Sequence, residues 1–443
     1  MSGPTASGTA SGSPQHEPRG LGRTFANVFT ANLASSLGDG IARTAAPLLA
    51  ARLTDDPVLI AGIVAVAMLP WLFFALPSGI LVDRMDRRRA LGLAAAIRTV
   101  LALAILALVA TDSLTIWWLY LVIFVYGACE TLYDGAIRAV VPSVVPKAKL
   151  PRANARIEGA ELVVQNFAAA PLTSLLFAVA VLIPLTGLAA AYALAVVLAL
   201  LLPAVASGQQ FRAGSDGTPT PAVPFRRQLA DGWRFIMADR MLRTLWFFTT
   251  GTGVLFSAAS ATLVLFVLQT LEIPEAAFGL FLLAGAIGGL LGSVVASRLA
   301  ARFGSGPVMA ATMLLAAAST LVIGLLPVAG VAISMFAISS GSITIWNILI
   351  MSLRQAIVPG RLLGRVHGTW RTLLWGSMPL GSMLGGVLAL AGLTVPWIIG
   401  GAVMTLATLV FYRFLMTLPN PEDIDNGDAP PPATGAVPTV PAA

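Results

Sequence analysis

The sequence has little charge, one cysteine and almost no lysine. Only 11% of its 443 residues are charged, whereas a soluble domain carries about 25%, so the chain lacks the polar surface that a water-soluble fold needs. The single cysteine, Cys129, excludes an intrachain disulfide and a metal site made of several thiolates. The sequence also contains no Walker loop and no nucleophile–base constellation. We therefore expect no enzyme activity, no cofactor, no metal and no ATP hydrolysis.

Long apolar runs make up most of the chain. Hydrophobic residues account for 57% of the sequence, and the mean hydropathy is +0.86. A helix needs about 20 apolar residues to cross ~30 Å of hydrocarbon, so a chain of this length can hold roughly twelve spans with short connectors. We predict an all-α integral membrane protein with spans near 25–50, 58–82, 90–111, 114–139, 153–179, 181–203, 242–269, 277–299, 307–327, 329–355, 366–391 and 394–416.

The positive charges gather in alternate connectors between these spans. The net charge is +7 and the sequence pI about 10.3, a basicity also found in proteins that bind nucleic acids. Here, however, the arginines follow every second span, for example at Arg84, Arg226 and Arg365, whereas the opposite connectors hold few charges. The positive-inside rule then predicts a multi-pass protein of the inner (plasma) membrane with both termini in the cytoplasm. No nucleic-acid partner is expected.

One long polar connector divides the chain into two halves. We predict a disordered N-terminal tail at 1–22, a six-helix half at 23–203, a cytoplasmic linker at 204–241, a second six-helix half at 242–417 and a disordered C-terminal tail at 418–443. Within the linker, the segment from Phe225 to Arg243 has the spacing of an amphipathic helix that lies along the membrane surface. Two six-helix halves are typical of one large transporter architecture.

Several polar residues lie inside the predicted spans, where a charge at the helix centre costs ~2.5–3.5 kcal/mol. Asp39 and Arg43 are four residues apart and can pair on one helix face, and the fourth span repeats this spacing. The candidates for proton coupling or for the substrate cavity are Asp39, Arg43, Glu130, Asp134, Arg138, Asn32 and Asn347. Two interpretations stay open. Either the acids exchange protons, because burial raises the pKa of a carboxylate and a nearby arginine lowers it, or the charges form fixed ion pairs that only set helix packing.

The connector between the second and third spans carries the most specific pattern, Gly79-Ile-Leu-Val-Asp-Arg-Met-Asp-Arg-Arg88. It resembles the signature loop of the major facilitator superfamily, Gly-x-Leu-x-Asp-Arg-x-Gly-Arg-Arg/Lys, with Asp86 in place of the second glycine. The matching residues are Gly79, Leu81, Asp83, Arg84, Arg87 and Arg88. The resemblance implies a twelve-transmembrane-helix major facilitator fold, with two six-helix halves around a central cavity. It also implies that this cytoplasmic gate loop holds the cytoplasmic side closed while the cavity opens outward.

Within the superfamily, residues 25–415 resemble the branch of drug and siderophore exporters that includes macrolide efflux proteins and the enterobactin exporter. The resemblance rests on Ser35 to Ala50, on Gly127 to Glu130 and on Pro151 to Ala155. It implies efflux of a drug or a secreted metabolite, with multidrug resistance as one role, by proton antiport. The glycine-rich antiporter motif of the fifth span is absent from the stretch 166–174, so this stretch gives no support to antiport.

We therefore predict a secondary active transporter that exports a small molecule by alternating access in exchange for protons. Its other expected partner is the lipid bilayer, in which it acts as a monomer. A nutrient importer or a passive facilitator is an open alternative, because a fold does not set the direction of transport. A second alternative is a non-transporting membrane sensor, although the short tails and linker leave little room for a signalling domain.

Overall fold

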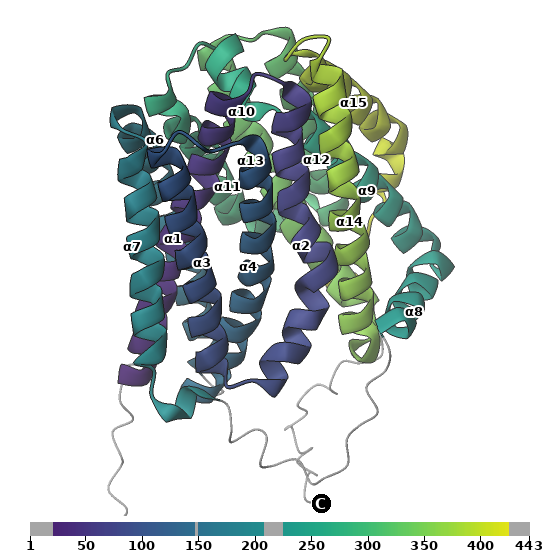
Figure 1. The fold of residues 1–443 in the computed structure, drawn as a ribbon. Coiled ribbons are helices and arrows are strands. Elements are labelled where there is room, and N and C mark those ends of the chain that lie inside the picture. Colours follow the sequence, from purple (N-terminus) through teal and green to yellow (C-terminus); the bar gives the residue numbers. More distant parts are fainter. Residues whose placement is uncertain (1–20, 147–148, 208–224, 425–443) are drawn as a thin grey trace, which may run out of the picture.

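The computed structural model describes residues 21–146, 149–207 and 225–424, and this part of the chain folds into helices without strands (Figure 1). The first half contains α1 (Arg23–Leu53), α2 (Pro57–Arg84), α3 (Arg87–Ala110), α4 (Ile116–Val144), α5 (Leu150–Leu162), the π-helix η2 (Val163–Ala169), α6 (Ala170–Val179), α7 (Leu182–Leu200) and η3 (Ala204–Ser207). The second half contains α8 (Phe225–Ala238), α9 (Arg240–Ser260), α10 (Leu263–Leu265), the π-helix η5 (Phe266–Thr270), α11 (Glu275–Phe303), α12 (Ser305–Leu325), α13 (Ala329–Ile357), α14 (Gly360–Ala389), α15 (Val395–Met416) and η6 (Pro421–Asp423). The all-α prediction is confirmed for these residues. The tails predicted at 1–22 and 418–443 lie mostly outside them.

Within the part of the chain that the structure describes, ten helices are long and apolar enough to cross a membrane, and the bent pair of α9 with the α10–η5 segment adds an eleventh. Their ends agree with the predicted spans to within a few residues. α1 is a continuous helix of 31 residues, which is about 46 Å at 1.5 Å per residue, but Asn32, Asp39 and Arg43 interrupt its apolar sequence. The count of twelve spans therefore stays a prediction. α1 would be the twelfth span, but its composition alone does not identify it as one.

Aspartates in the connectors fix where two helices of the first half begin. Asp56 precedes α2 and accepts a hydrogen bond from the backbone N–H of Val58 at 2.8 Å. Asp86 precedes α3 and accepts one from the backbone N–H of Arg88 at 2.9 Å. Such a cap satisfies an N–H of the first turn that has no partner within the helix. The aspartate that replaces glycine in the signature pattern thus starts α3.

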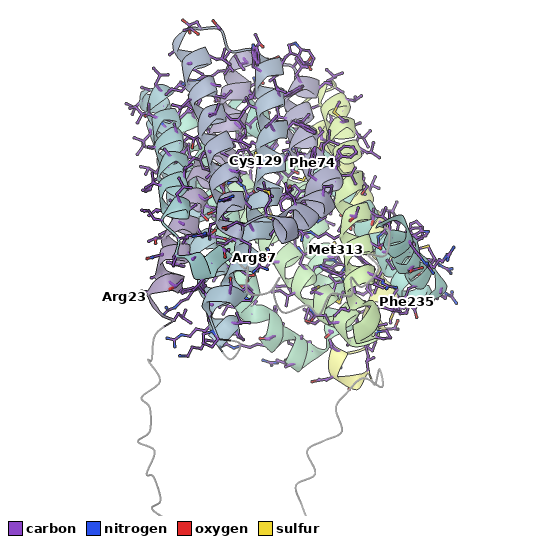
Figure 2. The ribbon with its side chains drawn as sticks, turned by 60° about the horizontal axis from the view of Figure 1, so that its bottom comes forward. Arg23, Phe74, Arg87, Cys129, Phe235 and Met313 are labelled. Carbon is purple, nitrogen blue, oxygen red and sulfur yellow. The ribbon has the colours of Figure 1, made fainter. Side chains whose placement is uncertain are left out.

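The helices form two groups that meet along two seams. α2 packs along α14, and α6 packs along α11. We call the end of the bundle at which α1 begins and α7 ends the linker side, and the end at which α1 gives way to α2 the opposite side (Figure 1). Figure 2 is turned so that the linker side comes forward, and it shows Arg23 and Arg87 there. The predicted amphipathic helix is present as α8, which packs against α14 and α9 at the edge of the bundle (Figure 1).

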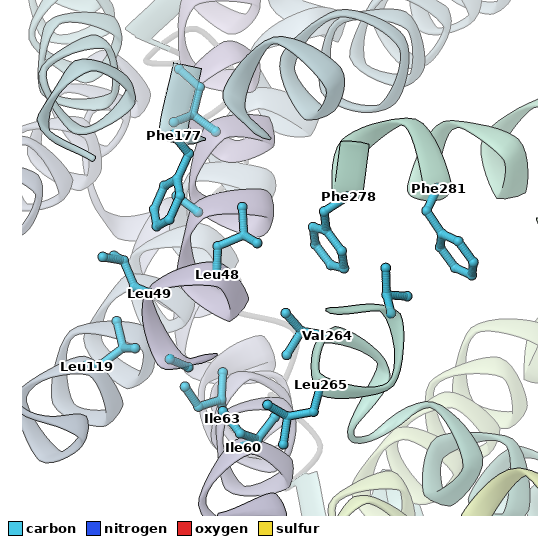
Figure 3. Packing of buried hydrophobic residues seen from close by; sticks show 14 of the residues in the cluster. Leu48, Leu49, Ile60, Ile63, Leu119, Phe177, Val264, Leu265, Phe278 and Phe281 are labelled. Atoms are coloured by element: carbon cyan, nitrogen blue, oxygen red, sulfur yellow. The ribbon is translucent and has the colours of Figure 1, made fainter. Parts of the chain in front are cut away.

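A buried hydrophobic cluster joins the two halves near the opposite side (Figure 3). Leu48 and Phe177 come from the first half, and Val264, Leu265 and Phe278 come from the second. Each of these side chains is at most 3% exposed. Close packing of this kind is what holds helices together in a membrane, where the surrounding lipid is as apolar as the side chains. The two halves are therefore in firm contact at this end of the bundle.

Candidate functional site

A buried ion pair joins α1 and α3 inside the first half. Nη1 of Arg98 donates to Oδ1 of Asp39 at 3.1 Å and to Oγ of Ser35 at 3.0 Å. Arg98 is completely buried, and Asp39 is 7% exposed. An uncompensated charge at this depth would be costly. Each residue of the pair therefore compensates the charge of the other.

Three tyrosines surround this ion pair. The hydroxyls of Tyr126 on α4 and Tyr192 on α7 donate to Oδ1 of Asp39 at 2.6 and 2.9 Å. The guanidinium carbon of Arg98 lies 5.2, 4.9 and 5.5 Å from the ring centroids of Tyr126, Tyr133 and Tyr192, within the cation–π range of about 6 Å. One carboxylate thus connects four helices of the first half. We call the five residues the buried charge cluster: Asp39, Arg98, Tyr126, Tyr133 and Tyr192.

Arg43 forms a second, more accessible ion pair. Its Nη2 lies 2.8 Å from Oε1 of Glu130 on α4, and its Nη1 donates to Oε1 of Gln165 on η2 at 3.1 Å. The side chain of Arg43 is 58% exposed and that of Glu130 is 12% exposed. The predicted pairing of Asp39 with Arg43 along α1 is therefore wrong. A pair four residues apart on one helix is worth only ~0.2–0.5 kcal/mol, and both side chains reach partners on other helices.

The remaining predicted polar residues lie on three helices. Nδ2 of Asn32 donates to Oε1 of Glu161 on α5 at 2.8 Å. Asp134 and Arg138 line a cavity on the linker side, and neither forms an ion pair with another described residue. Asn347 is exposed on α13 and belongs to none of the cavity walls described below.

The first part of the signature pattern is helical. α2 continues to Arg84, and only Met85 and Asp86 separate it from α3. The helical residues of the pattern are Gly79, Leu81, Asp83 and Arg84. Helix continues past the predicted apolar end at residue 82 because its backbone hydrogen bonds do not depend on apolar side chains.

The arginines at the start of α3 bind carbonyls at the ends of neighbouring helices. Nη1 of Arg87 donates to the carbonyl of Ala139 at 2.7 Å, and Nη1 of Arg88 donates to the carbonyl of Leu202 at 3.2 Å. Arg88 also pairs with Asp86 at 2.9 Å. Burial acts to raise the pKa of Asp86, but the hydrogen bonds and charge of Arg88 together hold that pKa below its usual value. These contacts hold the α2–α3 turn against α4 and against the chain that follows α7.

Two cavities meet at a pair of tryptophans. The linker-side cavity, of about 390 Å³, lies between α2 and α4 of the first half and α14 of the second, and its walls include Asp134 and Arg371. The second cavity, which we call the central cavity, has a volume of about 440 Å³ and lies among α1, α2, α3, α4 and α7 of the first half, and it is mostly apolar, with Glu130 among its few polar groups. Trp71 and Trp375 belong to both walls, with ring centroids 6.1 Å apart. The guanidinium of Arg371 lies 5.3 and 5.1 Å from these two rings.

Polar contacts close the opposite side. Nε and Nη2 of Arg52 on α1 bond the two carboxylate oxygens of Glu275 on α11 at 3.0 and 2.6 Å. Nε2 of Gln269 donates to Oδ1 of Asp55 at 2.7 Å. Both contacts connect the first half to the second. The halves are thus bonded at the opposite side and separated by a cavity at the linker side.

Sequence analysis missed Arg98 as a site residue. The signal was present, because Arg98 is an arginine in the middle of an otherwise apolar predicted span, where a charge needs a partner. The tyrosines gave a weaker signal, since tyrosine is also common at membrane interfaces. Gln165 was not predicted either, because a neutral amide carries no comparable cost.

Comparison with known proteins agrees with this architecture. A family described as "Transmembrane secretion effector" matches residues 21–434, and no curated protein matches the chain. A mutant of the nucleoside transporter NupG superposes with a TM-score of 0.70 at 12% identity, covering 89% of this chain and 100% of that one. A bacterial homologue of the iron transporter ferroportin in its inward-facing state gives 0.66 at 15% identity, with coverage of 89% and 100%. A bacterial homologue of the human lysosomal transporter Spinster, inward-facing and unoccupied, gives 0.58 at 13% identity, with coverage of 89% and 95%.

At these identities the structural likeness supports the fold, and the family match extends over nearly the whole chain. The family and its structural neighbours are membrane transporters and not enzymes, as predicted. The chain is therefore a multi-pass membrane transporter that belongs to the transmembrane secretion effector family of the major facilitator superfamily.

Proposed function

We propose that this chain exports a small molecule across the plasma membrane by alternating access, in exchange for protons, and that it works as a monomer. The observation that carries the proposal is a pair of cavities that share Trp71 and Trp375, one at the linker side and one bordered by the Arg43–Glu130 pair. The Arg52–Glu275 contact joins the halves at the opposite side. A cavity between the halves at one side and contact between them at the other is the arrangement expected of one state in alternating access.

The distribution of arginine supports the orientation in this proposal. The connectors on the linker side carry most of the arginines, so the positive-inside rule favours a cytoplasmic position for that side and for both termini. In that orientation the cavity opens to the cytoplasm, as in two inward-facing structural neighbours. The direction of transport, export, is inferred from the resemblance of residues 25–415 to exporters. In the opposite state, the signature pattern from Gly79 to Arg88 would hold the cytoplasmic side closed, as its resemblance implies.

The Arg43–Glu130 pair is suited to exchange a proton for a substrate. The carboxylate of Asp39 accepts three hydrogen bonds inside the first half, which hold it in one position. Glu130 is held by one arginine whose side chain is more than half exposed. A proton on Glu130 would release Arg43 from the pair. Asp134, one turn closer to the linker side on the cavity wall, provides a site through which the proton can leave.

The test is substrate accumulation in an efflux-deficient host. Cells that express the chain are loaded with a panel of neutral, cationic and anionic fluorescent compounds, with and without a protonophore. We expect lower accumulation of at least one compound, an effect that is lost with protonophore and in the Glu130→Gln variant. The matched control is Glu422→Gln, an exposed acid outside the spans, which should behave as wild type.

Other outcomes would contradict specific parts of the proposal. Export that continues in Glu130→Gln and under protonophore would remove proton coupling. Uptake driven by the substrate gradient alone would favour an importer or facilitator. No transport of any compound by the purified chain in proteoliposomes, under either polarity of pH gradient, would favour a sensor.

A further inference from the structure

A third, smaller cavity lies beside Arg43, between the two halves, and a larger share of its wall is polar than in the central cavity. It has a volume of about 260 Å³, and its walls come from α1, η2, α6, α11 and α13. The polar side chains in its wall are Arg43, Thr44, Gln165, Asn166 and Ser340. We call it the amide cavity, after the two carboxamides. Arg43 also belongs to the wall of the central cavity, so one side chain borders both.

The two cavities differ in chemistry. The central cavity is lined largely by alanine, leucine, isoleucine and valine side chains from α1, α2, α3, α4 and α7. The amide cavity presents two consecutive carboxamides, and both lie on the π-helical turn η2. π-helical turns are rare and are frequent at functional sites. Arg43 bonds Glu130 in the first cavity and Gln165 in the second. An apolar compartment thus adjoins a hydrogen-bonding one, with a single guanidinium between them.

The hydrogen-bonding groups of the amide cavity have unused capacity. Oε1 of Gln165 accepts from Arg43, and no described residue bonds the amide N–H groups of Gln165. Nδ2 of Asn166 donates to the carbonyl of Leu162 at 3.2 Å, and no described residue bonds Oδ1 of Asn166. One wall therefore offers both a donor and an acceptor, which a ligand amide complements with its C=O and N–H.

The charges around the central cavity and the amide cavity are already compensated. Arg43 pairs with Glu130, and Arg98 pairs with Asp39. A ligand with a net charge would either break one of these pairs or remain unpaired in a medium that penalises charge. A neutral ligand incurs neither cost.

We infer that the transported molecule is a neutral amphiphile whose apolar body occupies the central cavity and whose amide-bearing end binds Arg43, Gln165 and Asn166. This inference deepens the proposed function and rests on it for the role of the site in transport. While Glu130 is ionised, its bond to Nη2 of Arg43 holds the guanidinium beside Gln165, and the remaining N–H groups of Arg43 can donate to the ligand carbonyl. A proton on Glu130 would break this arrangement and weaken binding of the amide end, as exchange of substrate for protons requires.

The test is binding to the purified full chain in lipid nanodiscs. Three probes share a ten-carbon chain and differ in the end group: N-decanoylglycinamide is neutral, N-decanoylglycine is anionic and decyltrimethylammonium is cationic. Binding is followed by tryptophan fluorescence, because Trp71 and Trp375 line the central cavity, after subtraction of the signal from partition into the nanodisc lipid. We expect the neutral amide to bind at least about tenfold tighter than either charged probe, as for the loss of a hydrogen-bonded partner in a buried polar site.

Variants separate the two compartments. Gln165→Leu and Asn166→Leu should each weaken binding of the neutral amide probe about fivefold and leave decyltrimethylammonium, which has no amide, unchanged. Ala102→Phe, which fills the central cavity from α3, should weaken all three probes. Gln355→Leu replaces an exposed carboxamide away from both cavities and serves as the matched control. If the η2 variants do not fold, as judged by size-exclusion chromatography, Ser340→Ala takes their place.

Equal or tighter binding of a charged probe would overturn the inference, and so would unchanged amide affinity in the folded variants. Failure of the proposed function looks different. A chain that binds the amide probe but transports nothing in proteoliposomes contradicts the proposed function, whereas a chain that exports other compounds and ignores the amide probe contradicts only this inference.

Discussion

Arg98 on α3 and Asp39 on α1 are 59 positions apart in the sequence, yet their charged atoms lie 3.1 Å from each other. Arg98 has no exposed surface, so the pair depends for compensation on its own members, on Ser35 and on three tyrosines. The arrangement ties α1, α3, α4 and α7 into one unit. This pair is enclosed by protein, whereas the Arg43–Glu130 pair lies at the surface of a cavity.

Replacement of Arg98 by leucine should destabilise the protein strongly. The change leaves Asp39 as an unpaired buried charge, which costs about 3–5 kcal/mol in the free energy of unfolding. The double variant Asp39→Asn, Arg98→Leu should recover part of this loss, because no charge remains. The measurement is the thermal unfolding of purified variants in detergent, with the exposed Arg89→Leu as control. Equal midpoints for Arg98→Leu and Arg89→Leu would show that the pair does not stabilise the fold.

The tyrosine hydroxyls should contribute unequally. Tyr192→Phe removes a 2.9 Å hydrogen bond to the Asp39 carboxylate, which is worth about 1.5–3 kcal/mol because the acceptor is charged. Tyr133→Phe is a matched control, since its hydroxyl makes a 3.3 Å bond to the carbonyl of Ala31 and its ring remains over Arg98. We expect it to cost less than about 1 kcal/mol. The same unfolding assay compares them, and a larger loss in Tyr133→Phe would contradict the assigned roles.

Loss of the Arg52–Glu275 contact should shift the protein towards closure of the linker side. The bond is bidentate but partly exposed, so its removal is worth about 0.5–1 kcal/mol, or a two- to fivefold change in the equilibrium constant. The measurement uses Cys129→Ser as background and Thr372→Cys as a reporter in the linker-side cavity. Arg52→Ala should slow thiol labelling of the reporter by at most two- to fivefold, because that factor applies to the equilibrium constant between the two states.

The control for this experiment is Arg240→Ala, which removes an exposed arginine that forms no ion pair with another described residue. It should leave the labelling rate unchanged. Faster labelling in Arg52→Ala than in the background protein would mean that the contact does not hold the opposite side closed.

The stabilisation contributed by Asp86 should depend on pH in one direction. The pKa of Asp86 is held below its usual value in the folded protein, so its contribution is fully present above the ordinary aspartate pKa of about 3.9. The contribution is lost as the pH falls through the folded-state value. Asp86→Asn keeps the helix cap but loses the charge, so it should be less stable than wild type at pH 7 by up to ~1 kcal/mol. Unfolding midpoints between pH 3 and pH 7 check this, and a gap that widens on acidification would refute it.

Much of the architecture could be predicted from local properties of the sequence. The apolar run 90–111 became α3, and the run 277–299 became α11, because crossing a bilayer demands apolar length and complete backbone hydrogen bonding within each segment. The amphipathic spacing after Phe225 likewise became α8. These features depend on neighbours within a few residues, so they can be seen without knowledge of the fold.

The site could be predicted only in part. Asp39, Arg43 and Glu130 were recognised as polar residues within spans, which identifies them as members of a site but does not name their partners. The spacing of four within α1 indicated the wrong pair. Arg43 instead meets Glu130, 87 positions away.

The sequence by itself determined that this chain is a helical membrane protein of two halves and which polar residues must be sheltered from lipid. The tertiary structure alone decided which charges are enclosed with each other and which face a cavity. It also decided that Gln165 joins Arg43 at the boundary between an apolar and a polar compartment. The physical reason is that the energy of a buried charge depends on the distance and orientation of groups on other helices, and helix packing sets these distances.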